Sequence, residues 1–160
     1  MQVPGAVVVD GTVGLGGHAE AVLVTFPHAR LLGMDRDPEA LALAGQRLAR
    51  FGERVRLVHG SYATLAAALA EAGWPAPQAV LLDLGVSSLQ LDRAARGFSF
   101  RGGQALPDMR FDAQGSEATA ADLVNHASEQ DLAAVLEEHA REVRARAVAR
   151  AIVRGRPFQG

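Results

Sequence analysis

Short apolar runs alternate with amphipathic stretches along the first 84 residues of the chain. Such alternation is typical of parallel strands joined by crossover helices. Four apolar runs predict strands, at residues 6–10, 30–35, 55–59 and 79–84. The fourth run, AVLLDL, predicts a strand that is buried on both faces of the sheet. We therefore expect an α/β fold in which helices flank a parallel sheet.

Helices between these strands are predicted from spacing and from residues that start or stop helices. Residues 18–26 leave room for a helix that Pro27 stops, and residues 65–72 form an alanine- and leucine-rich helix that ends at Gly73. Asp37 and Pro38 are typical of a helix start. The apolar residues that follow lie three or four positions apart, as on one helix face, and are Leu41, Ala44, Leu48 and Phe51, with Gly52 ending the helix.

The second half of the chain is less regular. Residues 85–115 contain glycines, serines, prolines and charges without a sustained period, which predicts a long irregular segment. Loops of that length are usually functional or disordered. A short helix is expected at residues 119–125. Ser128, with Asp131 three positions on, resembles a capping box for a longer helix that runs to about Arg154.

A glycine-rich turn, DGTVGLGGH from Asp10 to His18, follows the first predicted strand. At such a turn the backbone can approach a ligand so closely that a Cβ atom would collide with it. Asp35 ends the next strand 19 residues after Gly16, where a carboxylate can accept hydrogen bonds from both hydroxyls of a ribose. Turn and acid together indicate an adenosine-containing cofactor, whereas the glycines alone could form merely a tight turn.

Two classes of cofactor fit this turn. Gly14, Gly16 and Ala19 satisfy the G-x-G-x-x-A form of the dinucleotide fingerprint, so an NAD-binding oxidoreductase is the main alternative. Asp10, four residues before Gly14, instead matches the acid with which methyltransferases bind the charged amino-acid end of S-adenosyl-L-methionine. The positive end of the following helix dipole would also favour an acid there. No catalytic constellation of an oxidoreductase can be named in this chain.

Polar residues follow the fourth predicted strand, at the sheet edge where open parallel sheets place ligands. A carboxylate directly after Val80-Leu81-Leu82 would be costly to bury, so Asp83 is expected to hydrogen-bond a ligand or a loop backbone. Without this acid, Ser87, Ser88 and Gln90 would be ordinary turn residues. Because Asp83 is present, these three residues are candidates for a functional site.

Composition narrows the class of protein. The chain has no run of about 18 apolar residues, no secretory signal and no cysteine, so we expect a cytoplasmic protein without disulfides or a membrane partner. Its five histidines lack ligand spacing, so no metal site is expected. The net charge of −2 argues against a uniformly basic nucleic-acid coat.

Positive charge is nevertheless concentrated in one segment. All 16 basic residues are arginine, and six of them lie between Arg141 and Arg156. Arginine suits phosphate, so Arg144, Arg146 and Arg150 are candidates for RNA contact, with a solvated helix face as the alternative. A genome rich in G and C would explain the absence of lysine, but it would not explain the clustering.

Seven motifs occur in a fixed order along the chain. They are DGTVGLGGH (10–18), MDRDPEAL (34–41), HGSY (59–62), LLDLGVSSLQLD (81–92), RGFSF (96–100), DMRFD (108–112) and ARAIV (149–153). In this series the chain resembles the bacterial ribosomal RNA cytosine-N4 methyltransferase family, also called the MraW family. The resemblance implies a Rossmann-like fold that uses S-adenosylmethionine to methylate a cytosine in the decoding region of 16S rRNA in the small ribosomal subunit. It also implies a cofactor domain over residues 1–100 and the start of a helical insertion over 101–160.

The resemblance assigns roles residue by residue. It implies cofactor contacts at Gly16, Gly17, His18, Asp35, Tyr62, Asp83 and Gln90. It implies that Tyr62 lies beside adenine, at a position where the family often has phenylalanine. Asp108, Met109 and Arg110 match a family signature that we expect at the active-site wall or at RNA, with an ordered loop as the alternative.

The implied reaction suggests which groups are catalytic. The amino nitrogen of cytosine is a poor nucleophile, because its lone pair is delocalised into the ring. An acceptor for its N–H should help as the methyl group arrives. Asp83, Ser87 and Ser88 are the candidates for this acceptor.

Three departures from the family pattern matter. The chain has Leu106-Pro107 before Asp108 where the family usually has Pro-Leu, and residues 141–144 replace a more acidic stretch. Family members are also about twice as long, so we expect the last strands of the sheet and an S-F-H-S motif to be missing after Gly160. A truncated fragment that binds the cofactor without transferring a methyl group is therefore a further alternative. Whether the chain forms a homodimer stays open.

Overall fold

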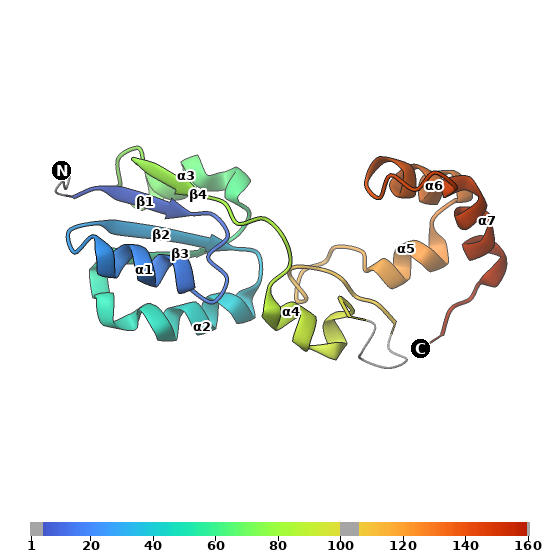
Figure 1. The fold of residues 1–160 in the computed structure, drawn as a ribbon, viewed down its shortest axis with the longest axis horizontal. Coiled ribbons are helices and arrows are strands. Elements are labelled where there is room, and N and C mark those ends of the chain that lie inside the picture. Colours follow the sequence, from blue (N-terminus) through green and yellow to red (C-terminus); the bar gives the residue numbers. More distant parts are fainter. Residues whose placement is uncertain (1–4, 100–105, 160) are drawn as a thin grey trace. The chain divides into compact units, whose positions relative to one another are not determined.

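The computed structural model of the chain describes residues 5–99 and 106–159, which belong to two compact units (Figure 1). The first unit comprises Met1–Ser87 and the second Ser88–Gly160. The domain boundary expected at residue 100, together with Phe100 of the RGFSF motif, lies outside the described residues.

The first unit is built on a four-stranded parallel sheet. Its strands are β1 (Val7–Asp10), β2 (Arg30–Asp35), β3 (Val55–His59) and β4 (Ala79–Leu81), in the order β3-β2-β1-β4. Val9 of β1 lies opposite Leu32 of β2 on one side and Val80 of β4 on the other. The predicted parallel α/β architecture is therefore confirmed, and β2 and β3 have the predicted bounds.

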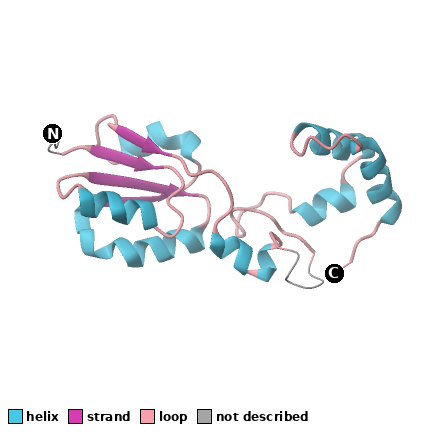
Figure 2. Ribbon diagram, viewed as in Figure 1, coloured by secondary structure: helices cyan, strands magenta, loops and turns pink. Residues whose placement is uncertain are grey.

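Helices cover both faces of this sheet (Figure 2). The helices are α1 (Gly17–Thr25), α2 (Pro38–Leu48) and α3 (Leu65–Glu71), with 3-10 turns at Ala49–Arg54 and Tyr62–Thr64. Leu31 of β2 packs with residues of α1 and α2, whereas Leu32 and Met34 pack with residues of α3. This alternation follows from the period of two in a strand, and it buries β2 on both faces. As predicted, Asp37 caps α2, and its carboxylate accepts from the amide of Glu39 at 3.0 Å.

Strand β4 differs from its prediction. It was expected to be buried on both faces, but Val80 is 49% exposed, and Leu82, beyond the strand's end at Leu81, is 45% exposed. Among the described residues β4 pairs with β1 alone, so it is an edge strand. An apolar run predicts that a strand forms, but burial also requires neighbours that cover it.

The second unit contains only helices and loops among its described residues. Its helices are α4 (Ser88–Asp92), α5 (Ala120–His126), α6 (Glu129–Glu138) and α7 (Ala145–Gly155), with a 3-10 turn at Ala94–Arg96. Residues 85–115 were expected to be irregular throughout, so α4 and this turn correct that prediction. Thr119 and Asp122 form a capping box at the start of α5.

The single helix predicted from Ser128 to about Arg154 is wrong. The chain forms α6 and α7 instead, and Arg141 between them has a φ of 52°. The turn allows Leu132 and Ala133 of α6 to pack against Ala149 of α7. A continuous helix could not bring these apolar faces together, so their burial favours the break. The hydroxyl of Ser128 still caps α6 by accepting from the amide of Asp131 at 3.1 Å.

Candidate functional site

The candidate site lies at the carboxyl ends of β1, β2 and β4. Asp10 is the last residue of β1, Asp35 is the last residue of β2, and Asp83 follows β4 by two positions. The charges of Asp35, Asp83 and His18 all lie close enough to Asp10 to influence its pKa. The structure thus brings together four residues that the sequence indicated in three separate segments.

Asp10 is the one buried acid of this group, with 1% of its surface exposed. Its Oδ1 accepts a hydrogen bond from the Thr12 amide at 3.2 Å. No described residue donates to its Oδ2, although that atom is buried. Burial raises the pKa of Asp10 above its ordinary value, and the Thr12 amide and nearby His18 oppose this effect. This buried carboxylate oxygen can accept a hydrogen bond that no described residue donates.

The glycine turn owes its glycines partly to packing inside the protein. Gly16 has a φ of 80°, and a Cβ there would lie 3.3 Å from Leu48 Cδ1 and 3.4 Å from the Ala44 Cα. Glycine was predicted here because a ligand approaches the backbone closely. At Gly16, helix α2 also approaches the backbone closely and by itself leaves little room for a Cβ atom. Gly11 was not singled out from the sequence, yet a Cβ there would lie 2.6 Å from Leu82 Cδ2 and 2.9 Å from Tyr62 Cβ. Only the spatial neighbours of Gly11 reveal this requirement.

Asp35, which we expected to bind a ribose, also organises the turn itself. Its Oδ2 accepts from the Gly14 amide at 2.8 Å, and its Oδ1 accepts from the Asp37 amide at 3.0 Å. Each carboxylate oxygen can accept a second hydrogen bond, so capacity for ribose hydroxyls remains. Asp35 therefore connects the shape of the glycine turn to the start of α2.

Asp83 is exposed rather than buried, which overturns the reason given for its importance in the sequence. Its side chain is 67% exposed and lies 3.8 Å from the Nδ1 atom of His18, measured from Oδ2. The Asp83 amide donates to the hydroxyl of Thr12 at 2.7 Å. Tyr62 is 44% exposed, and its Cβ lies near Gly11 of the same turn. The side chains of Asp83 and Tyr62 are therefore both accessible to a ligand.

The remaining catalytic and cofactor candidates are divided between the two units. Ser87 is half-buried at the end of the first unit, and Ser88 is the exposed first residue of α4 in the second. Gln90, also in α4, is 3% exposed. The roles expected for these three residues stay predictions.

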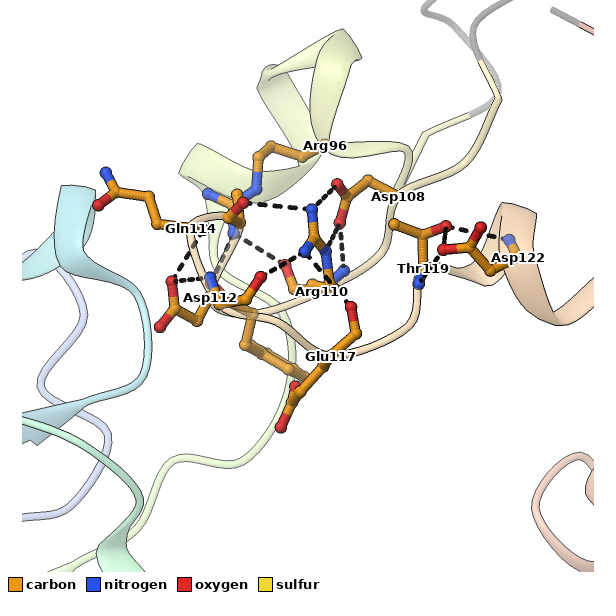
Figure 3. Close-up of polar contacts among 11 residues, drawn as sticks. Arg96, Asp108, Arg110, Asp112, Gln114, Glu117, Thr119 and Asp122 are labelled. Atoms are coloured by element: carbon orange, nitrogen blue, oxygen red, sulfur yellow. Dashed lines mark hydrogen bonds and ion pairs between the residues drawn. The ribbon is translucent and has the colours of Figure 1, made fainter.

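Arg110 is the centre of a hydrogen-bonded loop in the second unit (Figure 3). Its Nε and one terminal nitrogen donate to the two carboxylate oxygens of Asp108, at 2.9 and 2.7 Å. The guanidinium also donates to three backbone carbonyls, those of Ala113, Gly115 and Glu117. A guanidinium has five N–H donors, so all of them are occupied inside the loop. This geometry favours the ordered-loop interpretation of the Asp108-Met109-Arg110 signature over contact with RNA.

Arg96 supports the same loop and was not identified from the sequence. It is 7% exposed, and one of its terminal nitrogens donates to the carbonyls of Arg110 and Phe111, at 3.0 and 2.7 Å. Its neighbour Asp108 has a pKa below the ordinary value, chiefly because the Arg110 side chain donates to its carboxylate. The RGFSF and DMRFD motifs thus meet in one structural cluster.

The basic segment lies on and beside α7. Arg146 and Arg150 are exposed and four positions apart, which puts them on the same helix face, and Arg144 directly precedes the helix. Arg150 Nε lies 3.3 Å from the Glu129 carboxylate of α6. Contact between these arginines and RNA stays a prediction.

The described residues, 5–99 and 106–159, contain no group of three or more histidines and acids placed to hold a metal ion. These residues also contain no helix with the length and apolar character needed to cross a membrane.

The chain is similar to several known proteins. A protein of Nocardioides sp. described as ribosomal RNA small subunit methyltransferase H is 53% identical over 95% of this chain and 47% of its own length. Its counterpart from Nocardia farcinica is 51% identical over 98% of this chain and 49% of its own. A solved structure described as a putative rRNA-methylase from Clostridium thermocellum is 26% identical, covering 40% of this chain and 36% of that chain with a TM-score of 0.36.

This chain spans about half the length of the curated relatives it matches. The model of the MraW methylase family matches residues 1–159, which is nearly the whole chain. The family expected from the motifs is confirmed: the chain belongs to the MraW methylase family.

Proposed function

We propose that this chain carries the S-adenosylmethionine site of a methyltransferase that modifies N4 of a cytosine in the decoding region of 16S rRNA. Membership of the MraW methylase family, and relatives described as ribosomal RNA small subunit methyltransferase H, support methyl transfer to small-subunit ribosomal RNA. The single structural observation that carries the cofactor assignment is the buried, unpartnered Oδ2 atom of Asp10.

The negative charge of this site favours S-adenosylmethionine over NAD. The amino-acid end of S-adenosylmethionine carries an ammonium group, which can donate to a buried carboxylate. The pyrophosphate of NAD is an anion, and Asp10, at the carboxyl end of β1 just before the glycine turn, would repel it. The carboxylate acceptors of this site therefore fit S-adenosylmethionine better than a dinucleotide.

The other proposed contacts with the cofactor follow from where each residue lies in the family motifs. Gly14, Gly16 and Gly17 would accommodate the cofactor along the turn, with Asp35 accepting from the ribose hydroxyls. Tyr62 presents an exposed ring for adenine. His18 and Asp83 are the further contacts that we propose in the first unit, and the cofactor contact expected of Gln90 stays a prediction. When bound, the cofactor supplies a methyl group already activated by its sulfonium, so these residues mainly orient the reactants.

Asp83 is the acceptor that we favour for the cytosine amino group. Its carboxylate is exposed at the end of β4, where a base could approach it. A carboxylate that accepts an N–H as the methyl group arrives raises the electron density on nitrogen and can take up the released proton. Ser87 and Ser88 are the other candidates, as neutral acceptors.

Calorimetric titration of the chain with S-adenosylmethionine, beside NAD, tests the cofactor assignment. We expect saturable binding of S-adenosylmethionine, and we expect Asp35→Ala to weaken it by about 10- to 100-fold, because the ribose loses a charged acceptor and the turn loses its Gly14 bond. Glu53→Ala, at an exposed acid outside the site, is the control and should bind like the wild type. Tighter binding of NAD, or an Asp35→Ala variant with unchanged affinity, would contradict the proposal.

The arginines of residues 144–150 are proposed to contact phosphate. Replacing Arg144, Arg146 and Arg150 together with glutamine should reduce the slope of log affinity against log salt by about 2 to 3 units, as expected for three lost phosphate contacts. The control replaces Arg47, Arg50 and Arg56, three exposed arginines of the first unit. Fluorescence anisotropy with a fragment of small-subunit RNA measures both slopes, and equal slopes for the two triple variants would rule out a specific role for α7.

Transfer of a labelled methyl group to small ribosomal subunits tests the proposed methyl transfer. Labelled 16S rRNA is the expected result, and cofactor binding without labelled RNA would contradict this part of the proposal.

A further inference from the structure

Thr12 joins the loop after β1 to the chain after β4. The paired strands end with Asp10 opposite Leu81, and the Gly11 amide then donates to the Leu81 carbonyl at 2.9 Å. In a regular parallel ladder the next bond would run from the Asp83 amide to the Gly11 carbonyl. The Asp83 amide donates instead to the hydroxyl of Thr12, at 2.7 Å. A side chain thus extends the connection between β1 and β4 beyond the last strand residues.

The same residue also holds the buried acid. The Thr12 amide donates to Oδ1 of Asp10 at 3.2 Å. Thr12 therefore contacts Asp10 through its backbone and Asp83 through its side chain. One residue fixes the spacing between the buried acid proposed to bind the cofactor ammonium and the exposed acid proposed to accept the N–H.

Few other contacts hold the Asp83 segment in place. The flanking side chain of Leu84 is 66% exposed, and that of Leu82, which lies against Gly11, is 45% exposed, so packing restrains this segment only in part. The carboxylate of Asp83 has a long contact with His18, at 3.8 Å. The hydrogen bond to Thr12 is consequently the short, well-defined restraint on the backbone that carries this carboxylate.

We propose that Thr12 is a positioning residue that sets the location of the Asp83 carboxylate relative to Asp10 and the cofactor. This inference rests on the proposed function, because it assigns Asp83 to the cofactor and the reacting nitrogen. Thr12 acts through Asp83 and need not contact either reactant. Its hydroxyl matters as an acceptor, so a hydroxyl-bearing residue can replace it and a residue of the same shape without one cannot.

Thr12→Val tests this role, since valine keeps the branched shape and the backbone amide but cannot accept from Asp83. We expect its affinity for S-adenosylmethionine to fall by about three- to tenfold, the effect of one neutral hydrogen bond. Thr12→Ser should recover most of that loss. Thr25→Val, at an exposed threonine in the last turn of α1, is the matched control. Should Thr12→Val not fold, as judged by its thermal melt, Thr12→Ala makes the same deletion.

A double-mutant cycle separates positioning from a general effect on the fold. In an Asp83→Ala background, Thr12→Val should cost no further affinity, because the group that Thr12 positions has been removed. An equal loss in both backgrounds would overturn the inference, as would a Thr12→Val variant that binds like the wild type. Absence of binding by the wild-type chain would instead overturn the proposed function, and this inference with it.

Discussion

Replacing Asp10 with asparagine is expected to weaken binding of S-adenosylmethionine by about 10- to 100-fold and, at the same time, to stabilise the free chain. Asparagine can still accept the Thr12 amide through its carbonyl oxygen. Its NH₂ group would then occupy the place of the orphaned Oδ2 atom and face the cofactor ammonium as a second donor. Affinity falls because the ion pair is lost.

The free chain is expected to gain stability for the opposite reason. Asp10 is 1% exposed, so in the absence of ligand its charge is poorly solvated and its pKa is raised, mainly by burial. A neutral amide avoids this cost. We expect the midpoint of thermal unfolding of the first unit to rise by about 5 °C, the shift that roughly 1 kcal/mol gives to a unit of this size. Fluorescence of Trp74, which lies in the first unit, reports this transition.

The pH dependence has a definite sign. Because the pKa of Asp10 is raised, the folded chain holds this proton more tightly than the unfolded chain does, so ionisation destabilises the fold as pH rises from 3.8 through the folded-state pKa. The advantage of Asp10→Asn should therefore be largest above the folded-state pKa and should vanish below about pH 3.8. Wild-type affinity for the cofactor should rise over the same interval, since only the carboxylate binds the ammonium.

Asp92→Asn is the matched control, because Asp92 is an exposed acid of the second unit. It should change neither cofactor affinity nor the Trp74 transition. An Asp10→Asn chain that binds S-adenosylmethionine as tightly as the wild type would remove the main support for the cofactor assignment. If Asp10→Asn lowered both the affinity for S-adenosylmethionine and the thermal stability, the carboxylate of Asp10 would be shown to stabilise the fold and not to be reserved for a ligand.

The sequence predicted those elements whose signals are local. The bounds of β2 and β3 follow from short apolar runs, and the cap at Asp37 follows from one acid before a proline. The break between α6 and α7 has no such signal, since neither glycine nor proline occurs between Ser128 and Arg154. It is decided by burial of Leu132 against Ala149, and Val143 in the turn is left 94% exposed.

The same distinction between local signals and long-range contacts applies to the candidate site. Spacing along the chain identified Asp10 and Asp35, because a strand, a turn and a helix follow one another locally. The contact between Thr12 and Asp83 joins residues 71 positions apart and depends on β4 lying beside β1, which no local pattern encodes. The exposure of Asp83 likewise depends on β4 being an edge strand. Sequence reasoning therefore found the acids but not what holds them.

Arg110→Ala is expected to release the loop that carries the DMRFD motif. The substitution removes five hydrogen bonds at once and leaves the Asp108 carboxylate without its charged partner. The same loop anchors α5, because the amides of Ala120 and Ala121 donate to the carbonyls of Asp108 and Pro107. We expect hydrogen exchange at these two amides to accelerate by on the order of 100-fold.

Arg110→Lys separates the shape of the side chain from its charge. Lysine keeps the positive charge but cannot form the fork that reaches Asp108 and three carbonyls together, so it should rescue little of the protection. If Arg110 instead served as a phosphate contact, lysine would restore RNA affinity while leaving exchange at α5 as slow as in the wild type. Arg154→Ala, at an exposed arginine of α7, is the control and should leave these amides protected.

The pH dependence of this effect runs opposite to that of Asp10. Arg110 lowers the pKa of Asp108, so the ion pair stabilises the loop above pH 3.8, and this contribution is lost as pH falls through the lower folded-state pKa. The difference in exchange between wild type and Arg110→Ala should therefore narrow below about pH 4, once intrinsic exchange rates are taken into account. At each pH, Trp74 fluorescence should be the same in the wild type and in Arg110→Ala, because Trp74 lies in the first unit. A difference that persists undiminished in acid would mean that the three carbonyl bonds, and not the ion pair with Asp108, hold the loop.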